Sequence, residues 1–341
     1  MNTYRAMFAA IVLVALSPTF VHAADELIPG RWYATAEAGL NLTQAAYSDN
    51  WRGGENSSLA WSSVLSATAR RRFHNSVEWN NVLKLRFGQQ YQQSTRSDGS
   101  RRWSAPEKSE DKIDFESIGL ISRDWKVDPY VSGRFASQFL DVSDPNRRSV
   151  PINPITVRES AGVAKLLLQN KDESVLVRFG FTGRQNYRRL FIDPVSTTKE
   201  GKFTNDSGIE LQGDWRLRIL ENRVVWVAKA SIYKPFSWSE ADKFDRVAAD
   251  SLASAGIARA VNDFSTAVDV SWENEFTTEV TRWVSFSLYV ELVWDKYDNS
   301  VTPILNAGGN QIANAAAVHD AIRQAVQWKQ SFAAGLTFHL L

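Results

Sequence analysis

The chain has 341 residues, in which 39 Lys and Arg nearly balance 38 Asp and Glu. This balance excludes a broad basic face for nucleic acid, and the absence of cysteine excludes a disulfide framework, a thiol nucleophile and a Cys-ligated metal. With 13 Trp but only 44% hydrophobic residues, the composition favours a wall between lipid and water over a compact core.

The first residues have the pattern of a secretory signal. Arg5 is positive, Ala6–Leu16 is apolar, and Val21-His22-Ala23 fits the small-residue rule for cleavage. We predict a signal over residues 1–23, cleaved near Ala23, and a periplasmic lead over 24–32. The apolar run is shorter than the about 20 residues that a membrane helix needs, so we expect an exported protein.

From residue 33 to the end, apolar and polar residues alternate in long stretches, which is typical of β-strands with one apolar face. In the stretch 113–124 the alternation is ambiguous, because Ile118 and Leu120 stand at polar positions. The predicted strands are 33–46, 58–70, 75–91, 113–124, 130–140, 155–168, 174–185, 208–220, 224–238, 264–276, 280–295 and 327–341.

The connections between these strands alternate in length. Those after every second strand are short, as at 71–74 and 221–223, and the others are longer, as at 92–112 and 296–326. We therefore predict an all-β fold: one antiparallel transmembrane β-barrel over 33–341 with about twelve strands, long extracellular loops and short periplasmic turns. A count of ten or fourteen strands is the alternative. The expected location is the outer membrane, in contact with lipid and lipopolysaccharide.

The last strand carries a second signal. Gly335, Phe338 and Leu340 resemble the terminal assembly signal of bacterial outer-membrane barrels, so we expect the outer-membrane assembly machinery to bind there. Leu341 stands where such signals commonly have Phe. Strand 33–46 is the expected neighbour that closes the barrel.

Charges of both signs fall at the inward positions of the predicted strands. In one interpretation they pair across a narrow lumen and keep its wall solvated. In the other, an acidic side faces a basic side and orients small polar solutes in a channel. The candidate lumen residues are Lys84, Arg86, Arg134, Arg158, Asp269, Glu273, Glu275 and Glu291.

Signals for an enzyme are poor, and we expect no catalytic residue, cofactor or metal. His339 is the best candidate for an outer-membrane hydrolase, but the sequence has no G-x-S-x-G companion for it. The histidines have no metal-ligand spacing.

Two of the long loops contain apolar residues at helical spacing. These are 239–257 and 311–326, for which we expect either ordered surface loops or a lid over the barrel mouth.

The first long loop has an unusual motif, N-L-T-Q followed by N-W-R-G-G-E-N-S. Gly53 and Gly54 permit a tight turn, and Asn56 can bond to the backbone of a turn. Together with later residues, the motif resembles an uncharacterised family of bacterial outer-membrane barrels, a domain of unknown function, over about residues 36–165. The matching residues are Asn41, Gln44, Trp51, Gly53, Gly54, Asn56, Trp79, Asn81, Gly88, Asp111, Lys112, Ile113, Phe135, Gln138 and Phe139.

Two residues depart from the pattern of that family: Phe87 replaces a Tyr, and Ala136-Ser137 precedes Gln138. The resemblance implies location and architecture, and it supplies no substrate. Porin-like passage of small polar solutes is the expected function. The alternatives are a non-conducting barrel for adhesion, scaffolding or envelope assembly and, third, an outer-membrane hydrolase.

Overall fold

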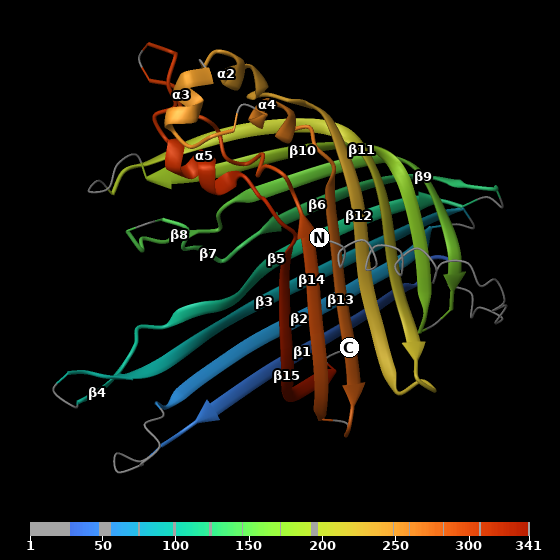
Figure 1. The fold of residues 1–341 in the computed structure, drawn as a ribbon. Helices are drawn as coiled ribbons and strands as arrows, with labels where there is room; N and C mark the ends of the chain where they lie inside the picture. The colour runs from blue at the N-terminus through green and yellow to red at the C-terminus, as the bar shows by residue number, and fades with distance from the viewer. Residues whose placement is uncertain are drawn as a thin grey trace, which may run out of the picture.

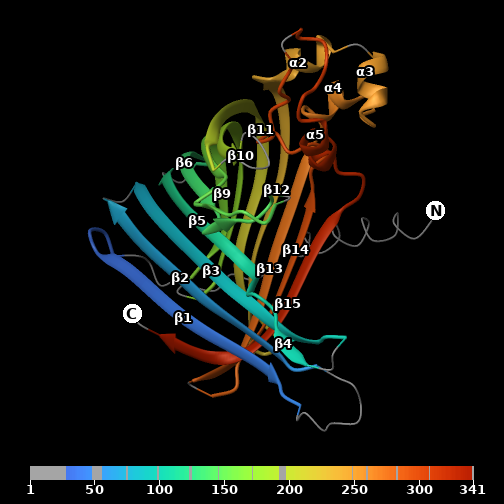
Figure 2. The same cartoon turned by 90° about the vertical axis from the view of Figure 1, so that its left-hand side faces the viewer.

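The computed structural model describes residues 28–47, 56–73, 76–97, 100–122, 125–144, 146–170, 172–191, 197–247, 249–258, 260–281, 283–306 and 308–339. Within them, twelve long antiparallel strands close into a barrel (Figure 1, Figure 2). The predicted signal over 1–23 lies outside this part of the chain. The barrel strands are β1 (Trp32–Ala45), β2 (Ser58–Phe73), β3 (Val77–Thr95), β5 (Glu107–Ile121), β6 (Asp128–Ser137), β9 (Ile155–Gln169), β10 (Ser174–Phe191), β11 (Lys199–Ile219), β12 (Val224–Trp238), β13 (Asp269–Glu279), β14 (Val284–Trp294) and β15 (Gln327–His339).

Each barrel strand pairs with the next along the chain, and β15 returns to pair with β1. The predicted strand order and the predicted closure by the terminal strand are both confirmed. The observed strands are long, from the 10 residues of β6 to the 21 of β11, so they exceed the usual five or six residues of a soluble sheet.

Side chains alternate between the two faces of the wall, as the period of two requires. Along β15, Trp328 and Phe332 are each 69% exposed on the outer surface, whereas Lys329 and Ser331 between them are half-buried on the inner side. Aromatic rings pack against each other across strands of this wall, as with Phe286 and Phe332, whose centroids lie 6.0 Å apart.

The ambiguous parity of β5 has a structural reason. Ile118 and Leu120 point inward and are buried, and Leu120 packs with Tyr130 of β6 and Ala164 of β9. This apolar cluster occupies the lumen near the ends of these strands that carry the short turns. The interior is therefore not polar throughout.

The connections alternate in length as predicted. At one end, the short-turn end, they span 74–76, 122–127, 170–173, 220–223 and 280–283, and at the other, the long-loop end, most are longer. The connection predicted at 186–207 is shorter than expected, because β10 and β11 continue as a paired ribbon to Phe191 and Lys199. The long loops also hold the short strands β4 (Arg101–Trp103), β7 (Leu140–Asp141) and β8 (Val150–Pro151).

The two loops predicted to be helical fold together at the long-loop end, in a unit that we call the cap (239–268 and 295–326). It holds α2 (Ala241–Asp245), α3 (Ala249–Ser254), α4 (Val261–Phe264) and α5 (Ala315–Ala321), which gather above the ends of β12–β14 (Figure 2). Trp238, which the alternation places on the lipid face, is instead buried in the core of the cap. In the described part of the chain, no helix is long and apolar enough to cross a membrane.

Candidate functional site

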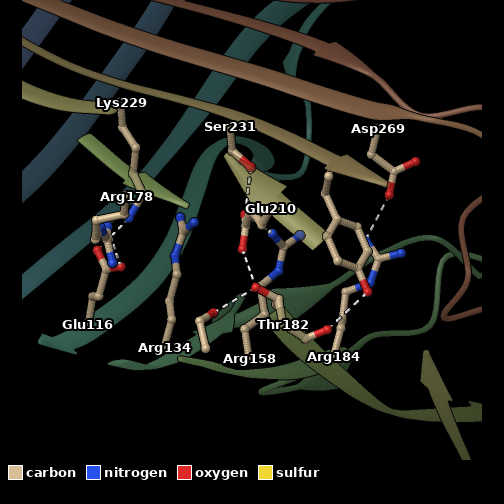
Figure 3. Close-up of polar contacts among 12 residues, drawn as sticks. Glu116, Arg134, Arg158, Arg178, Thr182, Arg184, Glu210, Lys229, Ser231 and Asp269 are labelled. Carbon is tan, nitrogen blue, oxygen red and sulfur yellow. Dashed lines mark hydrogen bonds and ion pairs between the residues drawn. The ribbon is translucent and has the colours of Figure 1, made fainter. Parts of the chain in front are cut away.

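The lumen contains a cluster of ion pairs that we call the central network: Glu116 on β5, Arg178 on β10, Asp214 on β11 and Lys229 on β12. The Arg178 side chain is 0% exposed and donates to Glu116 at 2.9 Å and to Asp214 at 2.6 Å. Lys229 contacts Glu116 and lies 3.6 Å from Asp214. Charge-assisted bonds of this kind are the strong ones in proteins, so they tie β5 across the lumen to β10 and β12 (Figure 3).

A second network lies beside the first and crosses from β5 and β6 to β13: Lys112, Asp114, Arg134 and Glu273. The Arg134 guanidinium donates to both oxygens of Asp114, at 2.8 and 2.6 Å, which is the bidentate geometry that Arg favours. Lys112 Nζ donates to Glu273 at 2.6 Å from the opposite wall. Arg134 also lies 3.8 Å from Glu273, so this carboxylate faces two cations.

The remaining predicted charges of β3, β13 and β14 lie close by. Arg86 forms an ion pair with Glu275 at 2.7 Å, and its guanidinium lies 4.5 Å from the ring centroid of Tyr289. The Tyr289 hydroxyl donates to Glu291 at 2.9 Å. Lys84 interacts electrostatically with Glu273 and Glu275. These residues extend the charged interior toward the wall of β14.

Toward the long-loop end, Glu210 accepts hydrogen bonds from side chains on three other strands, β9, β10 and β12. Arg158 lies 3.3 Å from Glu210, and the hydroxyls of Thr182 and Ser231 donate to it at 2.9 and 2.6 Å (Figure 3). Each carboxylate oxygen has a partner, which is what a buried charge requires.

A fourth group, the mouth network, contains Arg184, Asp206, Tyr233 and Asp269. Arg184 Nε donates to Asp206 at 2.9 Å, and its Nη1 donates to Asp269 of β13 at 3.0 Å. The Tyr233 hydroxyl donates to Asp206 at 2.6 Å. The Arg184 Nη2 atom is buried without a hydrogen-bond partner.

Above the mouth network lies a cavity of about 140 Å³ beneath the cap, with Arg158, Arg184, Asp295 and Asp298 among its lining residues. Asp295 follows directly after β14, and its burial, together with the nearby carboxylates of Asp269 and Asp298, raises its pKa to about 8. The cavity therefore presents both cations and carboxyl groups to anything that enters from the long-loop end.

The cap is fixed over this cavity by Asn299, which is buried. Its side-chain amide donates to Ser265 O at 2.9 Å and to Asp206 at 3.4 Å. Its backbone carbonyl oxygen accepts from the Thr204 hydroxyl at 2.7 Å and from the Trp238 indole at 3.1 Å. One residue of the long loop thus links the cap to the inner face of β11.

The candidate lumen residues predicted from the sequence differ in how the structure joins them. Arg86, Arg134, Arg158, Asp269, Glu273 and Glu275 take part in ion pairs, and Glu291 in a hydrogen bond. Sequence reasoning missed Asp206, because it lies in a segment assigned to a loop. Residues 204–207 are all polar, so the sequence has no apolar–polar alternation there that could have extended the strand, although burial alternates along it in the structure.

The first-loop motif lies apart from these networks. Asn41 donates to the Ser62 hydroxyl at 3.2 Å, and Asn56 accepts from the Thr95 hydroxyl at 3.0 Å. Gln44 lies near the end of β1, opposite Leu59 of β2. Trp51, Gly53 and Gly54 lie outside the described residues.

His339 lies opposite Glu37 in the register of β15 and β1, at the short-turn end and far along the strand from the cap. Among the described residues, no group of His, Asp and Glu is arranged to hold a metal ion.

The closed antiparallel wall, its apolar outer face and its charged interior define a β-barrel of the outer-membrane type. The sequence pattern of a family described as "Protein of unknown function (DUF3078)" matches residues 42–142, from the end of β1 to just beyond β7. The match lies within the region in which the sequence resembles an uncharacterised barrel family. It covers less than a third of the chain, so it describes similarity over that part.

Two further comparisons concern curated proteins and solved structures. No curated protein matches the chain. Among solved structures, the β domain of the Bordetella autotransporter BrkA is similar with 10% sequence identity and a TM-score of 0.29, covering 90% of this chain and 97% of that one. A likeness this weak adds nothing to the strand pairing described above.

Proposed function

We propose that the protein resides in the outer membrane, with its long-loop end outside, and gives small polar solutes a narrow and selective passage. The apolar outer face and the segregation of loop lengths support the location and the orientation. The predicted contacts with lipid, lipopolysaccharide and the assembly machinery belong to this proposal. Of the assembly residues, Gly335 lies where a Cβ would come within 2.1 Å of Asn41 Oδ1, Phe338 is on the outer face, and Leu340 is outside the described residues.

One observation carries the proposal: ion pairs join strands that are not neighbours at several levels of the lumen. Arg178–Glu116 and Arg184–Asp269 link strands three apart in the barrel, and Lys112–Glu273 links opposite walls. A lumen of this kind lacks the open water column of a wide porin. A solute that passes has to replace one partner of an ion pair for a moment. Small solutes with donors and acceptors, or with both charges, can do so at low cost because each broken contact is exchanged for another.

The cap gives a second candidate function some support. It has a buried core of its own, with Phe244, Val261 and Val318 among the residues, and it stands at the end that we place outside the cell. A folded unit there suits adhesion or binding of a partner by a barrel that conducts nothing.

Electrical recording in planar bilayers separates these two functions. We expect small, infrequent currents from the wild-type barrel and larger ones when the Lys112–Glu273 bridge is removed in the double variant Lys112→Met/Glu273→Gln. The matched control is Glu107→Gln, which changes an exposed carboxylate on the same strand and should leave the current unchanged. If neither the wild type nor the double variant passes current, and liposomes that contain them exclude small sugars and amino acids, the passage proposal is wrong.

A further inference from the structure

β1 and β15 pair over only part of their length, along the line that we call the seam. Pairing runs from Glu37–His339 to Asn41–Gly335 and stops there. Continuation of the same register would place Leu42 opposite Ala334 and Ala45 opposite Ser331, but these residues do not pair. β1 nevertheless remains paired with β2 up to Ala45, and β15 remains paired with β14 back to Gln327.

The two strands diverge toward the long-loop end (Figure 2). A cavity of about 310 Å³ lies where the pairing stops, and its lining comes from β1, β2, β5 and β15. Both edges of the split line it, with Asn41 and Thr43 on one side and Lys329 and Ser331 on the other. The cavity therefore lies in the wall at the split.

An unpaired strand edge is energetically unfavourable in a membrane, because hydrocarbon offers no hydrogen-bond partner to the free N–H and C=O groups. It is tolerated where water or a bound molecule satisfies those groups. Closure of the barrel would remove the edge, and the strands here are long enough for closure to continue. A split that stays open in the membrane therefore needs water or a bound molecule at this edge.

The lining of the cavity is apolar toward the outer surface and polar toward the lumen. Trp61 and Phe332 stand at outward positions, and Phe332 is largely exposed. Lys329, Ser331 and Glu110 stand at inward positions, and the Ser331 hydroxyl donates to Glu110 at 2.9 Å. A molecule that fits both parts has an apolar tail and a polar head.

The two charges facing the head have opposite signs. Glu110 is buried on β5, and Lys329 lies on β15 with its Nζ 5.8 Å from the ring centroid of Tyr289. Among the described residues, no carboxylate forms an ion pair with Lys329. An anionic group on the head would complement Lys329, and an ammonium group on the same head would complement Glu110.

From these observations we propose that the β1–β15 split is a lateral opening that binds a single-chain amphiphile with a zwitterionic head, which enters sideways from the membrane. The head lies between Lys329 and Glu110, and the chain leaves through the wall past Trp61 and Phe332. This site depends on the strand pairing and not on the passage of solutes proposed above.

Cysteine crosslinking tests the opening directly, because the chain has no cysteine of its own. A disulfide forms only where the two Cβ atoms approach to about 3.5–4.5 Å. In oxidised outer membranes, the pair Leu40→Cys/Leu336→Cys should crosslink, since these residues are registered partners. The pair Leu42→Cys/Ala334→Cys should stay reduced. Equal crosslinking of both pairs would show a closed seam and would overturn the proposal.

Binding is tested with lysophosphatidylcholine as the probe, by native mass spectrometry of the full-length barrel released from a nonionic detergent. We expect one retained molecule in the wild type and at least several-fold weaker retention in both Lys329→Met and Glu110→Gln. The control Lys165→Met removes an exposed lysine on β9 and should retain the probe as the wild type does. A monoacylglycerol, which has the tail but no charges, should be retained less well. Failure of the wild type to retain the probe, or retention that neither lumen variant weakens, would contradict the proposed occupant.

Discussion

Lys112 on β5 and Glu273 on β13 are 161 residues apart in the chain, yet the lysine Nζ lies 2.6 Å from the carboxylate. The two strands are not neighbours in the barrel, so this bond spans the lumen. It shows why the interior is better described as neutralised in pairs than as an acidic side facing a basic side. Acidic residues do cluster on β13, but each of Asp269, Glu273 and Glu275 has a cation in contact.

Removal of the Glu273 charge should change which ions pass. In Glu273→Gln, the cations of Lys112 and Arg134 lose a shared counterion while the shape of the side chain is kept. We expect a shift of the reversal potential toward anion preference under a salt gradient. We also expect a loss of about 1–3 kcal/mol in unfolding free energy, because the buried carboxylate that accepts from Lys112 and lies near Arg134 loses its charge.

The exposed carboxylate of Glu107 provides the control for that experiment. Glu107→Gln changes the net charge by the same amount at the rim of β5 and should move neither the reversal potential nor the stability. An equal shift in both variants would mean that net charge, and not the cross-lumen bond, sets the ion preference.

The sequence predicts the wall well and the interior contacts poorly, for a physical reason. Alternation is local, so each of the twelve strands is visible in its own segment, including the terminal one. Which inward residues meet across the lumen depends on the tilt and stagger of the whole barrel, which no single segment records. The contact of Arg178 with Glu116 could not be foreseen for that reason. Ile118 and Leu120 mislead because both are apolar and buried inside the barrel, where Leu120 packs in an apolar cluster.

The pairing of β9 with β10 requires two glycines that face each other. Gly162 is the registered partner of Gly180, and a Cβ at Gly162 would come within 2.2 Å of Phe179 O. In Gly162→Ala the strands have to separate, and overpacking of this kind typically costs about 1–3 kcal/mol. We expect a lower midpoint for unfolding in urea, measured by the loss of heat-modifiable migration on gels.

A second glycine in the barrel wall provides the control for Gly162→Ala. At Gly133, on β6, an added Cβ meets nothing within 4 Å, so Gly133→Ala should leave the midpoint unchanged or raise it slightly. A midpoint lowered equally by both substitutions would contradict the steric explanation.

Anchoring of the cap depends on Asn299. Asn299→Ala removes the two hydrogen bonds that the side-chain amide donates to Ser265 O and Asp206, so each of these buried acceptors loses one donor. We expect this to lower the unfolding free energy by about 1–3 kcal/mol. We expect faster cleavage of the cap by protease added outside intact cells, with the barrel itself preserved. Asn310→Ala, an exposed site in the same loop, should be cleaved at the wild-type rate. Unchanged cleavage of the Asn299 variant would show that the apolar core alone holds the cap.

Finally, the cap should loosen as the pH rises, because of Asp295. Burial and the neighbouring carboxylates of Asp269 and Asp298 raise its pKa from 3.8 to about 8, although Arg184 opposes the shift. Between these two values the folded protein holds a proton that the unfolded chain has released. Stability contributed by this group therefore falls as the pH rises from about 4 to about 8, and it changes little above that range.

In Asp295→Asn the side chain stays neutral at every pH, so protease resistance of the cap should no longer decline across this range. Asp320→Asn, at an exposed position in α5, should follow the wild-type profile. Arg158 and Arg184 line the same cavity and stay charged throughout, so they do not produce a change of their own. A wild-type cap that resists protease equally at pH values below and above this window would show that the Asp295 carboxyl is not held protonated by its surroundings.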